Sequence, residues 1–355
     1  MVLIQAAMHV LHGRLSERSF LSLPVALDYP FYLSPRQLRT VLACLAVITP
    51  TLNVASDPLV QEAHMHTPKL AHSQNSLHSP ALVRRLIRMT NIRHDDVVVE
   101  IGAGRGIITR QLAKVCSKVI AIEYDAALYD KLKHDLRAMG NVEIHCRDFL
   151  AYLLPKREFK IFANIPFNIT SAIMAHITKG KHLPADAYLI MQEEAARRYS
   201  GRPYARESLH SLLIKPRFKL RIIHQFANTD FSPIPNAHIV FLHIHRRNVP
   251  LLREAEYEQY RDFLCFVFSQ HGKDIEERTR AIFTRPQLSR VAREWRFSAA
   301  ARPIDLSVDQ WLGIFSYYLM GVSAEKQRLV QGAEKRLLKQ QSRLAKIHRN
   351  RRNQP

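Results

Sequence analysis

Short apolar runs alternate with helix-like segments between residues 95 and 191, and this alternation constrains the fold more than any other feature. The runs are rich in β-branched residues and lie at residues 97–101, 119–122, 142–144, 161–163 and 188–191. Segments with helical character separate the first three runs, at residues 107–115 and 126–139. Strands that are apolar throughout are typical of parallel sheets covered by helices on both faces. The pattern therefore predicts an α/β fold with a parallel, doubly wound, Rossmann-like sheet.

A glycine-rich turn, Gly102-Ala103-Gly104-Arg105-Gly106, follows the first run. Glycine lets the backbone approach a ligand closely, so Gly102 and Gly104 are candidate cofactor-binding residues. Such a turn alone also fits an NAD site, and two acidic residues narrow the choice. Glu123 ends the second run and can accept hydrogen bonds from ribose hydroxyls, while Asp148 follows the third and can accept from an adenine amino group. The alternative for each acid alone is an exposed cap at a strand end, but the ordered set favours an adenosyl cofactor.

The segment Asn164-Ile165-Pro166-Phe167 follows the fourth run, at the sheet edge where ligands bind in folds of this class. The lone pair of adenine N6 is delocalised, so acceptors for its two hydrogens would favour a pyramidal, nucleophilic nitrogen. The Asn164 side-chain oxygen and the Ile165 carbonyl can supply them. Pro166 restricts the preceding backbone, and Phe167 can stack on the base. We therefore predict these four as catalytic residues for methyl transfer to an adenine; the alternative is a proline turn with a buried phenylalanine.

The chain carries a formal charge of +21 over its 355 residues, which predicts a polyanionic partner such as a nucleic acid. Four cations alternate with apolar residues, which places them on one face of a predicted strand: Lys215, Arg217, Lys219 and Arg221. We interpret this face as a contact surface for RNA phosphates. The alternative is the solvated face of an edge strand, where lysine discourages pairing with another sheet.

Changes in pattern divide the chain into four parts. Prolines interrupt residues 1–70, which we expect to be a poorly ordered N-terminal extension. Residues 71–248 form the predicted Rossmann-like domain. Residues 249–320 form a predicted small α-helical domain that binds RNA. Its expected helices lie at residues 254–270, 286–295 and 307–320. Residues 321–355 form a basic tail with little to bury.

The cysteine and histidine patterns indicate neither a disulfide framework nor a metal site. The four cysteines, Cys44, Cys116, Cys146 and Cys265, form no CxxC pair, and the histidines show no HExxH motif. We therefore expect a cytoplasmic protein without a bound metal. The apolar run at residues 41–49 is too short to span a bilayer, so we expect no membrane contact. Nothing in the pattern demands a dimer, and we expect a monomer.

Taken together, the motifs resemble those of the rRNA adenine N6-methyltransferases, and within them the erythromycin-resistance (Erm) methyltransferases. The resemblance runs from about Ser73 to Tyr318, about 245 of the 355 residues. Four further segments belong to it: Ser73-Gln74-Asn75, Leu189-Ile190-Met191-Gln192-Glu193, Phe231-Ser232-Pro233-Ile234-Pro235 and Leu306-Ser307-Val308-Asp309-Gln310-Trp311. The set is specific, whereas any one member alone is not.

The resemblance implies S-adenosylmethionine as the methyl donor. It places Gln74 and Asn75 near the methionine end of the cofactor, Glu123 on its ribose and Asp148 on its adenine. It also places Asn164 among the cofactor-binding residues. These assignments agree with the roles that the residue types suggest for Glu123 and Asp148.

The resemblance also places Asn164 and Phe167 at the target base. It implies N6-methyl- or N6,N6-dimethyladenine in the peptidyl-transferase loop of 23S rRNA, a modification that would block macrolide, lincosamide and streptogramin B binding. The chain departs from the family at three places. Ser76 replaces the usual phenylalanine, Phe167 replaces the commoner tyrosine, and Asn236-Ala237-His238-Ile239 replaces a valine, an acid and a small residue.

Three alternatives stay open at this point. A small-subunit (16S) rRNA adenine dimethyltransferase of ribosome biogenesis shares nearly every motif, although residues 283–288 and 306–311 favour the Erm group. A non-catalytic RNA-binding relative would have little reason to retain Glu123, Asp148 and Asn164 together. An NAD-dependent oxidoreductase is disfavoured by the basic charge and by the segment at residues 164–167.

Overall fold

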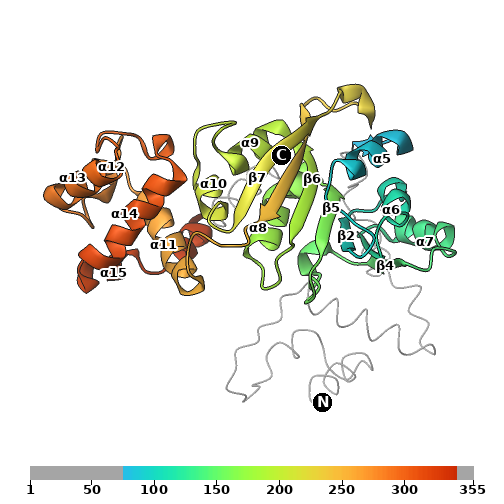
Figure 1. Ribbon diagram of the computed structural model, residues 1–355, viewed down its shortest axis with the longest axis horizontal. Helices are drawn as coiled ribbons and strands as arrows, with labels where there is room; N and C mark the ends of the chain where they lie inside the picture. Colours follow the sequence, from blue (N-terminus) through green and yellow to red (C-terminus); the bar gives the residue numbers. More distant parts are fainter. Residues whose placement is uncertain (1–74, 342–355) are drawn as a thin grey trace, which may run out of the picture. The chain divides into compact units, whose positions relative to one another are not determined.

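The centre of the structure is a seven-stranded mixed sheet with the strand order β4-β3-β2-β5-β6-β9-β7 (Figure 1). The computed structural model describes residues 75–341. The strands of this sheet are β2 (Val97–Ile101), β3 (Lys118–Glu123), β4 (Val142–Cys146), β5 (Lys160–Asn164), β6 (Asp186–Gln192), β7 (Phe218–Gln225) and β9 (Ile239–Arg246). All five predicted apolar runs are strands of this sheet. Burial on both faces explains the composition of β2, β3, β5 and β6, whereas β4 lies at the edge and is partly exposed.

Strands β2 to β6 run parallel, and the chain changes direction across the sheet between β2 and β5. From β2 the chain builds outward through β3 to β4, and then returns to place β5 on the other side of β2. β6 follows β5, and β9 and β7 complete that side as antiparallel strands. In open sheets of this kind, ligands bind at the carboxyl ends of the strands beside the switch point. The topology therefore points to the ends of β2 and β5.

Helices cover both faces of the sheet and create two apolar cores. Three helices pack on one face: α5 (Pro80–Arg88), α6 (Ile107–Leu112) and α7 (Ala126–Asp135). Two pack on the other: α8 (Thr170–Lys179) and α9 (Glu193–Ser200). Successive strand residues point to opposite faces, so Val98 belongs to the first core and Val99 to the second.

A second, two-stranded sheet joins the start of the described chain to a much later segment. β1 (Ser76–Leu77) pairs antiparallel with β8 (Phe231–Ser232). Leu77 and Phe231 face each other and are both buried in the core beneath α5 and α6. Both segments belong to motifs recognised in the sequence, but no contact between them was predicted.

The helices that follow β9 form an apolar cluster of their own with α10 (Leu209–Ile214). They are α11 (Tyr257–Ser269), α12 (Ile275–Thr279), α13 (Arg285–Glu294), α14 (Val308–Gly321) and α15 (Ala324–Val330), grouped together in Figure 1. Trp311 is fully buried among them, and its indole N–H donates to the Pro303 carbonyl at 3.1 Å. Short 3₁₀ helices lie at Phe149–Ala151, Phe167–Ile169, Asn228–Asp230, Glu254–Glu256 and Pro303–Asp305.

The prediction of a basic tail with little to bury from residue 321 is wrong for its first part. Val322, Val330 and Ala333 are buried against the helical cluster. Asp262 of α11 accepts hydrogen bonds from the N–H groups of Gly332 and Glu334 at 2.6 and 2.9 Å. These few apolar residues are enough to pack the segment against the helical cluster, because the cations between them can stay in solvent while the apolar side chains are buried.

Residues 1–74 and 342–355 lie outside the described residues, and with them the predicted extension at residues 1–70, Gln74 and the end of the basic tail. Within residues 75–341, no helix has both the length and the apolar character needed to cross a bilayer. Three cysteines in the same range are free thiols: Cys116, Cys146 and Cys265. The predicted Rossmann-like α/β fold with a C-terminal helical domain is confirmed.

Candidate active site

The glycine turn lies at the carboxyl end of β2, beside the switch point. Gly102, Gly104 and Gly106 have φ angles of 71°, 55° and 76°, in the left-handed region that favours glycine. A side chain at Gly102 would meet nothing within 4 Å, and one at Gly104 would reach only the Gly102 carbonyl. A side chain at Gly106 would collide with Leu132 and Arg110. The first two glycines therefore face open space, whereas packing requires the third.

Glu123 ends β3, the strand next to β2, and hydrogen bonds attach its carboxylate to the glycine turn. Its Oε2 accepts from the Gly104 N–H at 2.7 Å, and its Oε1 accepts from the Asp125 N–H at 2.9 Å. The residue is buried. A carboxylate oxygen can accept more than one hydrogen bond, so Glu123 keeps capacity for a hydroxyl donor. The structure thus brings two of the predicted cofactor residues, Gly104 and Glu123, into direct contact.

Asp148 lies on the loop after β4, and this loop is attached to the end of β3. The Arg147 N–H donates to the Glu123 carbonyl at 2.9 Å. Asp148 is exposed, and its Oδ1 accepts from the Leu150 N–H at 2.9 Å, which caps a short 3₁₀ helix. Asp148 therefore follows Glu123 along the carboxyl edge. The geometry agrees both with a capping role and with an acceptor for an adenine amino group.

Asn164 ends β5 on the other side of the switch point. The sheet register pairs Ile101 with Ala163, which brings Asn164 level with Gly102. The Asn164 side-chain N–H donates to the Asn75 carbonyl at 2.8 Å. This contact fixes the orientation of the amide and leaves its oxygen as an acceptor.

The next three residues continue from Asn164 without regular strand structure. The Ile165 N–H donates to the Ile190 carbonyl of β6 at 3.1 Å, so the sheet still holds this peptide. Pro166 has φ −63° and ψ 132° and precedes the 3₁₀ helix that Phe167 begins. Phe167 is half-buried against the core beneath α5 and α6. Its ring is therefore supported on one side and partly accessible on the other.

The pairing of β1 with β8 explains how the N-terminal motif reaches this edge. Asn75 directly precedes β1, and its carbonyl contacts Asn164. Gln74, the second residue that the resemblance places at the methionine end of the cofactor, lies outside the described residues. Of the predicted site, the structure therefore brings together Asn75, Gly102, Gly104, Glu123 and residues 164–167.

The residues present fit an adenosyl cofactor. The space over Gly102 and Gly104 allows a ligand to lie directly against bare backbone. An adenosine offers ribose hydroxyls and an exocyclic amine, which are hydrogen-bond donors, and the carboxylates of Glu123 and Asp148 are acceptors on the same edge. The donor and acceptor types therefore match along the carboxyl ends of β2, β3 and β4.

Glu100 is a further residue of this region, and it was not among the predicted site residues. It lies in β2 immediately before the turn and is 1% exposed, and neither carboxyl oxygen has a hydrogen-bond partner within residues 75–341. Burial raises the pKa of Glu100 from 4.5 to about 8. The negative charge of Glu123 adds to this rise in pKa, and the neighbouring Thr109 acts against it. An acidic residue inside an otherwise apolar run was the signal in the sequence.

The four cations predicted to share one strand face do not do so. β7 begins only at Phe218, because α10 extends to Ile214 and Pro216 interrupts the segment between them. Lys215 caps α10 rather than lying on a strand. The alternation of cations therefore crosses the end of a helix, a turn and the start of a strand.

The first two of these cations form structural ion pairs. Lys215 contacts the buried carboxylate of Glu207 at 2.5 Å. Arg217 pairs with Glu254 at 2.5 Å, and its guanidinium lies 3.7 Å from the centroid of the Tyr257 ring. Both side chains are mostly buried. The Lys215 pair therefore joins the two ends of α10, and the Arg217 pair joins the segment before β7 to the start of the helical domain.

Lys219 and Arg221 are exposed on β7, the antiparallel edge strand. They lie in register with His245 and His243 of β9, and His245 in turn faces Asp186 at the start of β6. This row belongs to the amino ends of the parallel strands, opposite the glycine turn. The interpretation as a solvated edge face therefore fits these two residues, and RNA contact by them stays a prediction.

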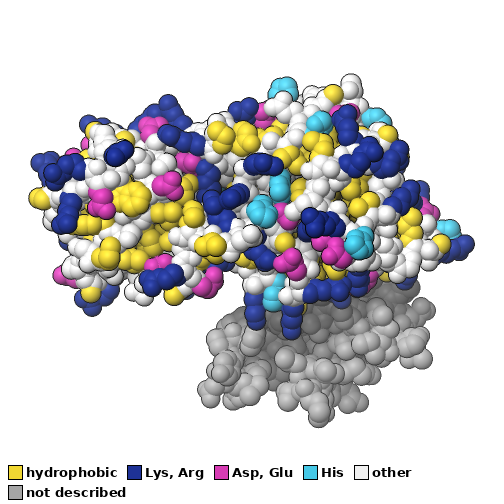
Figure 2. All heavy atoms as spheres, in the orientation of Figure 1, with side chains coloured by type: hydrophobic (Ala, Val, Ile, Leu, Met, Phe, Trp, Pro, Cys, Tyr) yellow, Lys and Arg dark blue, Asp and Glu magenta, His cyan; other side chains and the backbone are white. Residues whose placement is uncertain are grey.

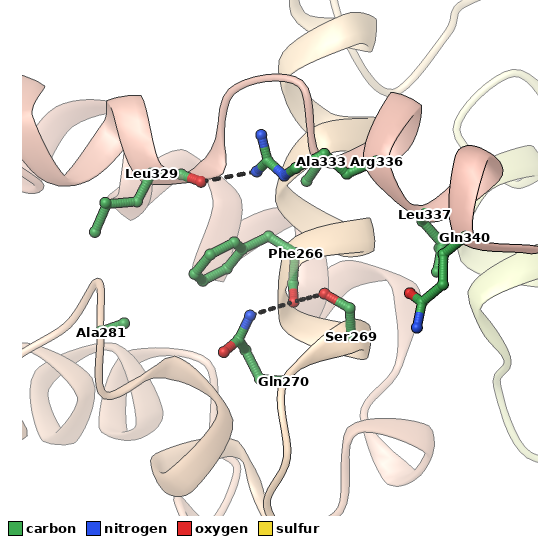
Figure 3. A pocket seen from close by; sticks show the side chains of 9 residues that line it. All are labelled: Phe266, Ser269, Gln270, Ala281, Leu329, Ala333, Arg336, Leu337 and Gln340. Carbon is green, nitrogen blue, oxygen red and sulfur yellow. Dashed lines mark hydrogen bonds between the residues drawn. The ribbon is translucent and has the colours of Figure 1, made fainter.

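A cavity of about 460 Å³ lies in the helical domain and contains none of the predicted site residues (Figure 3). The Phe266 ring projects into it from α11, and Leu329 lines it from α15. Polar groups around it bond to carbonyls of the helices: Gln270 to Phe266 at 3.4 Å and Arg336 to Leu329 at 2.9 Å. The cavity is thus a gap in helix packing, separate from the carboxyl edge.

Known proteins resemble this chain in sequence and in structure. An rRNA methyltransferase of Streptomyces thermotolerans is 29% identical over 244 residues, which cover 69% of this chain and 81% of the relative. The ribosomal RNA small subunit methyltransferase A of Thermotoga neapolitana is 29% identical over 217 residues, covering 60% and 81%. The crystal structure of the 23S rRNA methyltransferase ErmE matches with a TM-score of 0.64 at 26% identity, covering 69% of this chain and all of that chain.

The match to the family model covers more residues than either of these pairwise alignments. The sequence profile described as ribosomal RNA adenine dimethylase matches residues 65–319, which include the sheet and most of the helical domain. That match contains each site residue described above. The chain therefore belongs to the ribosomal RNA adenine dimethylase family of rRNA adenine N6-methyltransferases.

Proposed function

We propose that the chain transfers methyl groups to N6 of an adenine in the peptidyl-transferase loop of 23S rRNA. The position of Asn164 and Phe167 beside the open glycine turn is the observation that carries this proposal. The similarity to ErmE supports a large-subunit target. The product would be N6-methyl- or N6,N6-dimethyladenine, which confers resistance to macrolides, lincosamides and streptogramin B. We expect the enzyme to act as a cytoplasmic monomer.

The chain's own residues would hold S-adenosylmethionine along the carboxyl edge. The turn at Gly102 and Gly104 would bind it through bare backbone, Glu123 would accept from its ribose and Asp148 from its adenine. Asn75 would lie at the methionine end. When bound, the cofactor supplies an electrophilic methyl group on a positively charged sulfonium.

The protein's chemical task is to make adenine N6 nucleophilic. The Asn164 oxygen and the Ile165 carbonyl accept the two N6 hydrogens, which localises the nitrogen lone pair towards the methyl donor. The Asn75 carbonyl keeps the Asn164 amide in the orientation that this requires. Phe167 stacks on the base, an interaction worth roughly 1–3 kcal/mol. No strong base is needed, because the methylated amine loses its extra proton after transfer.

The target adenine must leave its stack to reach these residues, because N6 is paired inside a helix. Figure 2 shows Lys and Arg side chains gathered over α5, and the exposed arginines of that helix are Arg84, Arg85 and Arg88. Burial and the charge of the neighbouring Arg85 lower the pKa of His224 on β7. We propose that this basic surface and the helical domain bind the rRNA around the extruded base.

Methylation of isolated rRNA tests the proposal. The full-length protein is incubated with labelled S-adenosylmethionine and protein-free 23S rRNA, and N6-methylated adenines are mapped. Asn164→Ala should greatly slow the incorporation of label, whereas Asn168→Ala, which changes an exposed amide in the same 3₁₀ turn, should retain it. Label in the peptidyl-transferase loop that depends on Asn164 would support the proposal. Equal labelling by both variants would refute the role of Asn164.

The second candidate function is dimethylation of 16S rRNA in ribosome biogenesis. Its support is the similarity to the small subunit methyltransferase A of Thermotoga neapolitana, which shares the same identity with this chain as the Streptomyces relative. The same assay with 16S rRNA distinguishes the two targets. Label confined to 16S rRNA would support this second function and contradict the first. Cofactor binding without label on either RNA would favour a non-catalytic RNA-binding role.

A further inference from the structure

Three side chains converge at the amino edge of the sheet, opposite the glycine turn. His243 Nε2–H and His245 Nδ1–H both donate to Asp186 Oδ1, at 2.7 and 2.8 Å. One potential ligand atom from each residue lies within 4.8 Å of the other two. Two imidazoles and a carboxylate at this spacing form a donor set that fits a metal ion as well as a hydrogen-bonded cluster.

The strand register creates this cluster. His243 and His245 are two residues apart on β9 and therefore point to the same face. β9 pairs antiparallel with β6, which places His245 opposite Asp186 and His243 opposite Tyr188. The expectation of no metal rested on the absence of helical HExxH spacing. Alternation of histidines along a strand is the corresponding signal, but its third partner comes from β6, far away in the sequence.

Neighbouring groups hold the three side chains in place. The Asn91 side-chain N–H donates to Asp186 Oδ2 at 2.9 Å, and the Tyr188 hydroxyl donates to Asn91 Oδ1 at 2.7 Å. The Tyr188 ring stacks on His243, with centroids 4.5 Å apart and an interplanar angle of 13°. Such outer contacts orient ligands in metal sites, where ligating groups are themselves hydrogen-bonded.

The exposure of the three groups suits a site that a small ion can enter. Asp186 is 2% exposed, whereas the side chains of His243 and His245 are 16% and 39% exposed. The buried carboxylate thus lies beneath two imidazoles that are partly open to solvent.

We propose that Asp186, His243 and His245 bind a divalent transition-metal ion of the Zn²⁺ class, with water as the fourth ligand. Ligand atoms at about 2.0 Å from a tetrahedral Zn²⁺ are slightly further apart than the hydrogen-bonded atoms here, so small side-chain rotations admit the ion. Each neutral imidazole moves its proton to the outer ring nitrogen and turns the inner lone pair to the metal. The ion would join β6 to β9, where the parallel part of the sheet meets its antiparallel edge.

Nearby cations determine which ions the site accepts. Lys219 and Arg221 are exposed beside His245 and His243, and Lys160 lies in register with Asp186. Lys160 is already paired with Asp96 at 2.7 Å, and exposed charges are screened by solvent. Repulsion by these positive charges still weakens the binding of any metal cation. The site therefore needs the strong bonds that Zn²⁺, Ni²⁺ or Cu²⁺ form with imidazole nitrogen, and it excludes Mg²⁺ and Ca²⁺.

Metal titration tests the inference without RNA or methyl donor, so its failure leaves the proposed enzymatic function untouched. EDTA-treated, tag-free, full-length protein is titrated with Zn²⁺ in competition with a chromophoric chelator, and with Co²⁺ while visible absorption is recorded. One equivalent should bind, Co²⁺ should give the intense bands of a four-coordinate site, and Zn²⁺ should raise the melting temperature.

Three variants decide whether the site lies where we place it. His243→Gln and His245→Gln should weaken Zn²⁺ binding at least tenfold and abolish the thermal shift, whereas His134→Gln on α7, whose side chain is 74% exposed, should change neither. Unfolding curves recorded without metal will test whether each variant folds. Because His245 is more exposed than His243, its substitution should disturb the fold less. Binding that is absent, or equal in all variants, would overturn the inference and leave a purely hydrogen-bonded cluster.

Discussion

The two edges of the central sheet carry polar clusters that are built in opposite ways. At the carboxyl edge, the functional groups lie on the last residues of β3 and β5 and on the loops that follow β2, β4 and β5, and backbone atoms of a glycine turn take part. At the amino edge, Asp186, His243 and His245 lie inside the strands themselves, and only the pairing of β6 with β9 brings them together. The first cluster depends on where strands end, the second on how strands are aligned.

This difference explains what each edge can tolerate. Loop residues can change their chemistry while the strands beneath them stay buried, so the carboxyl edge can be specialised for one ligand. A slip of β9 by one residue would turn His243 and His245 away from the face that carries Asp186, so the amino edge is fixed by the same apolar pattern that fixes the sheet. Mutations at the two edges should therefore affect different measurable properties.

The largest effect should come from Asn164→Ala at the carboxyl edge. Loss of an acceptor that acts mainly in the transition state should slow methyl transfer ~100-fold or more. Single-turnover methylation of 23S rRNA measures the rate, and calorimetry with S-adenosylhomocysteine shows whether the cofactor affinity changes by less. A rate reduced only as much as the affinity would mean that Asn164 binds cofactor and does not act on the base.

Glu100→Gln should next change the pH dependence of stability. Because folding raises the pKa of Glu100 from 4.5 to about 8, the folded state binds an extra proton between these values. The free energy of unfolding should therefore fall as pH rises from 4.5 to 8, by at most about 1.4 kcal/mol per pH unit. Urea unfolding across this range should show the slope in the wild type and a weaker one in the variant. Parallel profiles would show that Glu100 is ionised in the folded protein.

Gly104→Ala and Gly106→Ala should separate ligand binding from packing within one turn. Both place a side chain at positive φ, which costs roughly 1–2 kcal/mol. At Gly104 the new methyl group enters the open space where the cofactor would lie, so S-adenosylhomocysteine should bind roughly tenfold more weakly, a loss of about 1.4 kcal/mol. At Gly106 it meets Leu132, so the melting temperature should fall more than for Gly104→Ala. Unchanged affinity of the Gly104→Ala variant for S-adenosylhomocysteine would mean that the space over Gly104 is not a binding surface, and equal losses of stability would mean that packing does not require Gly106.

The smallest effect should come from charge reversal on β7. Lys219→Glu with Arg221→Glu should weaken rRNA binding and reduce the slope of its salt dependence by ~1 for each phosphate that is no longer neutralised, without altering cofactor affinity. Lys131→Glu with Lys133→Glu on α7 makes the same change of net charge at another exposed place and serves as the control. Identical behaviour of the two double variants would reduce the β7 face to a solvated edge.

The carboxyl edge could be predicted from sequence because its signals are local. Gly102, Gly104, Glu123 and Asn164 each follow or end an apolar run, and parallel strands bring the ends of such runs to one edge. The pairing of β1 with β8 could not be predicted in this way, because two-residue strands leave no periodic pattern. For the same reason the contact between Asn75 and Asn164 appears only in the structure.

Periodicity gave a wrong prediction where a proline and a helix end interrupted it. Lys215 and Arg217 match a strand pattern with Lys219, yet Pro216 separates Lys215 from β7, and acidic partners hold both cations. The tail was misjudged for a related reason. Val330 and Ala333 are isolated apolar residues among charges, and only the facing surface of α11 reveals that they are buried.

The pairing of β1 with β8 has a consequence for synthesis on the ribosome. Asn75 emerges early, but its strand has no partner until Phe231 and Ser232 have been made, after nearly all of the sheet. Contacts between distant parts of a chain form late, and domains fold as units during translation. The carbonyl that orients the Asn164 amide thus reaches its position only in a nearly complete domain. A nascent or truncated chain would hold the glycine turn without the contact that orients Asn164, the residue that we propose acts on the target base.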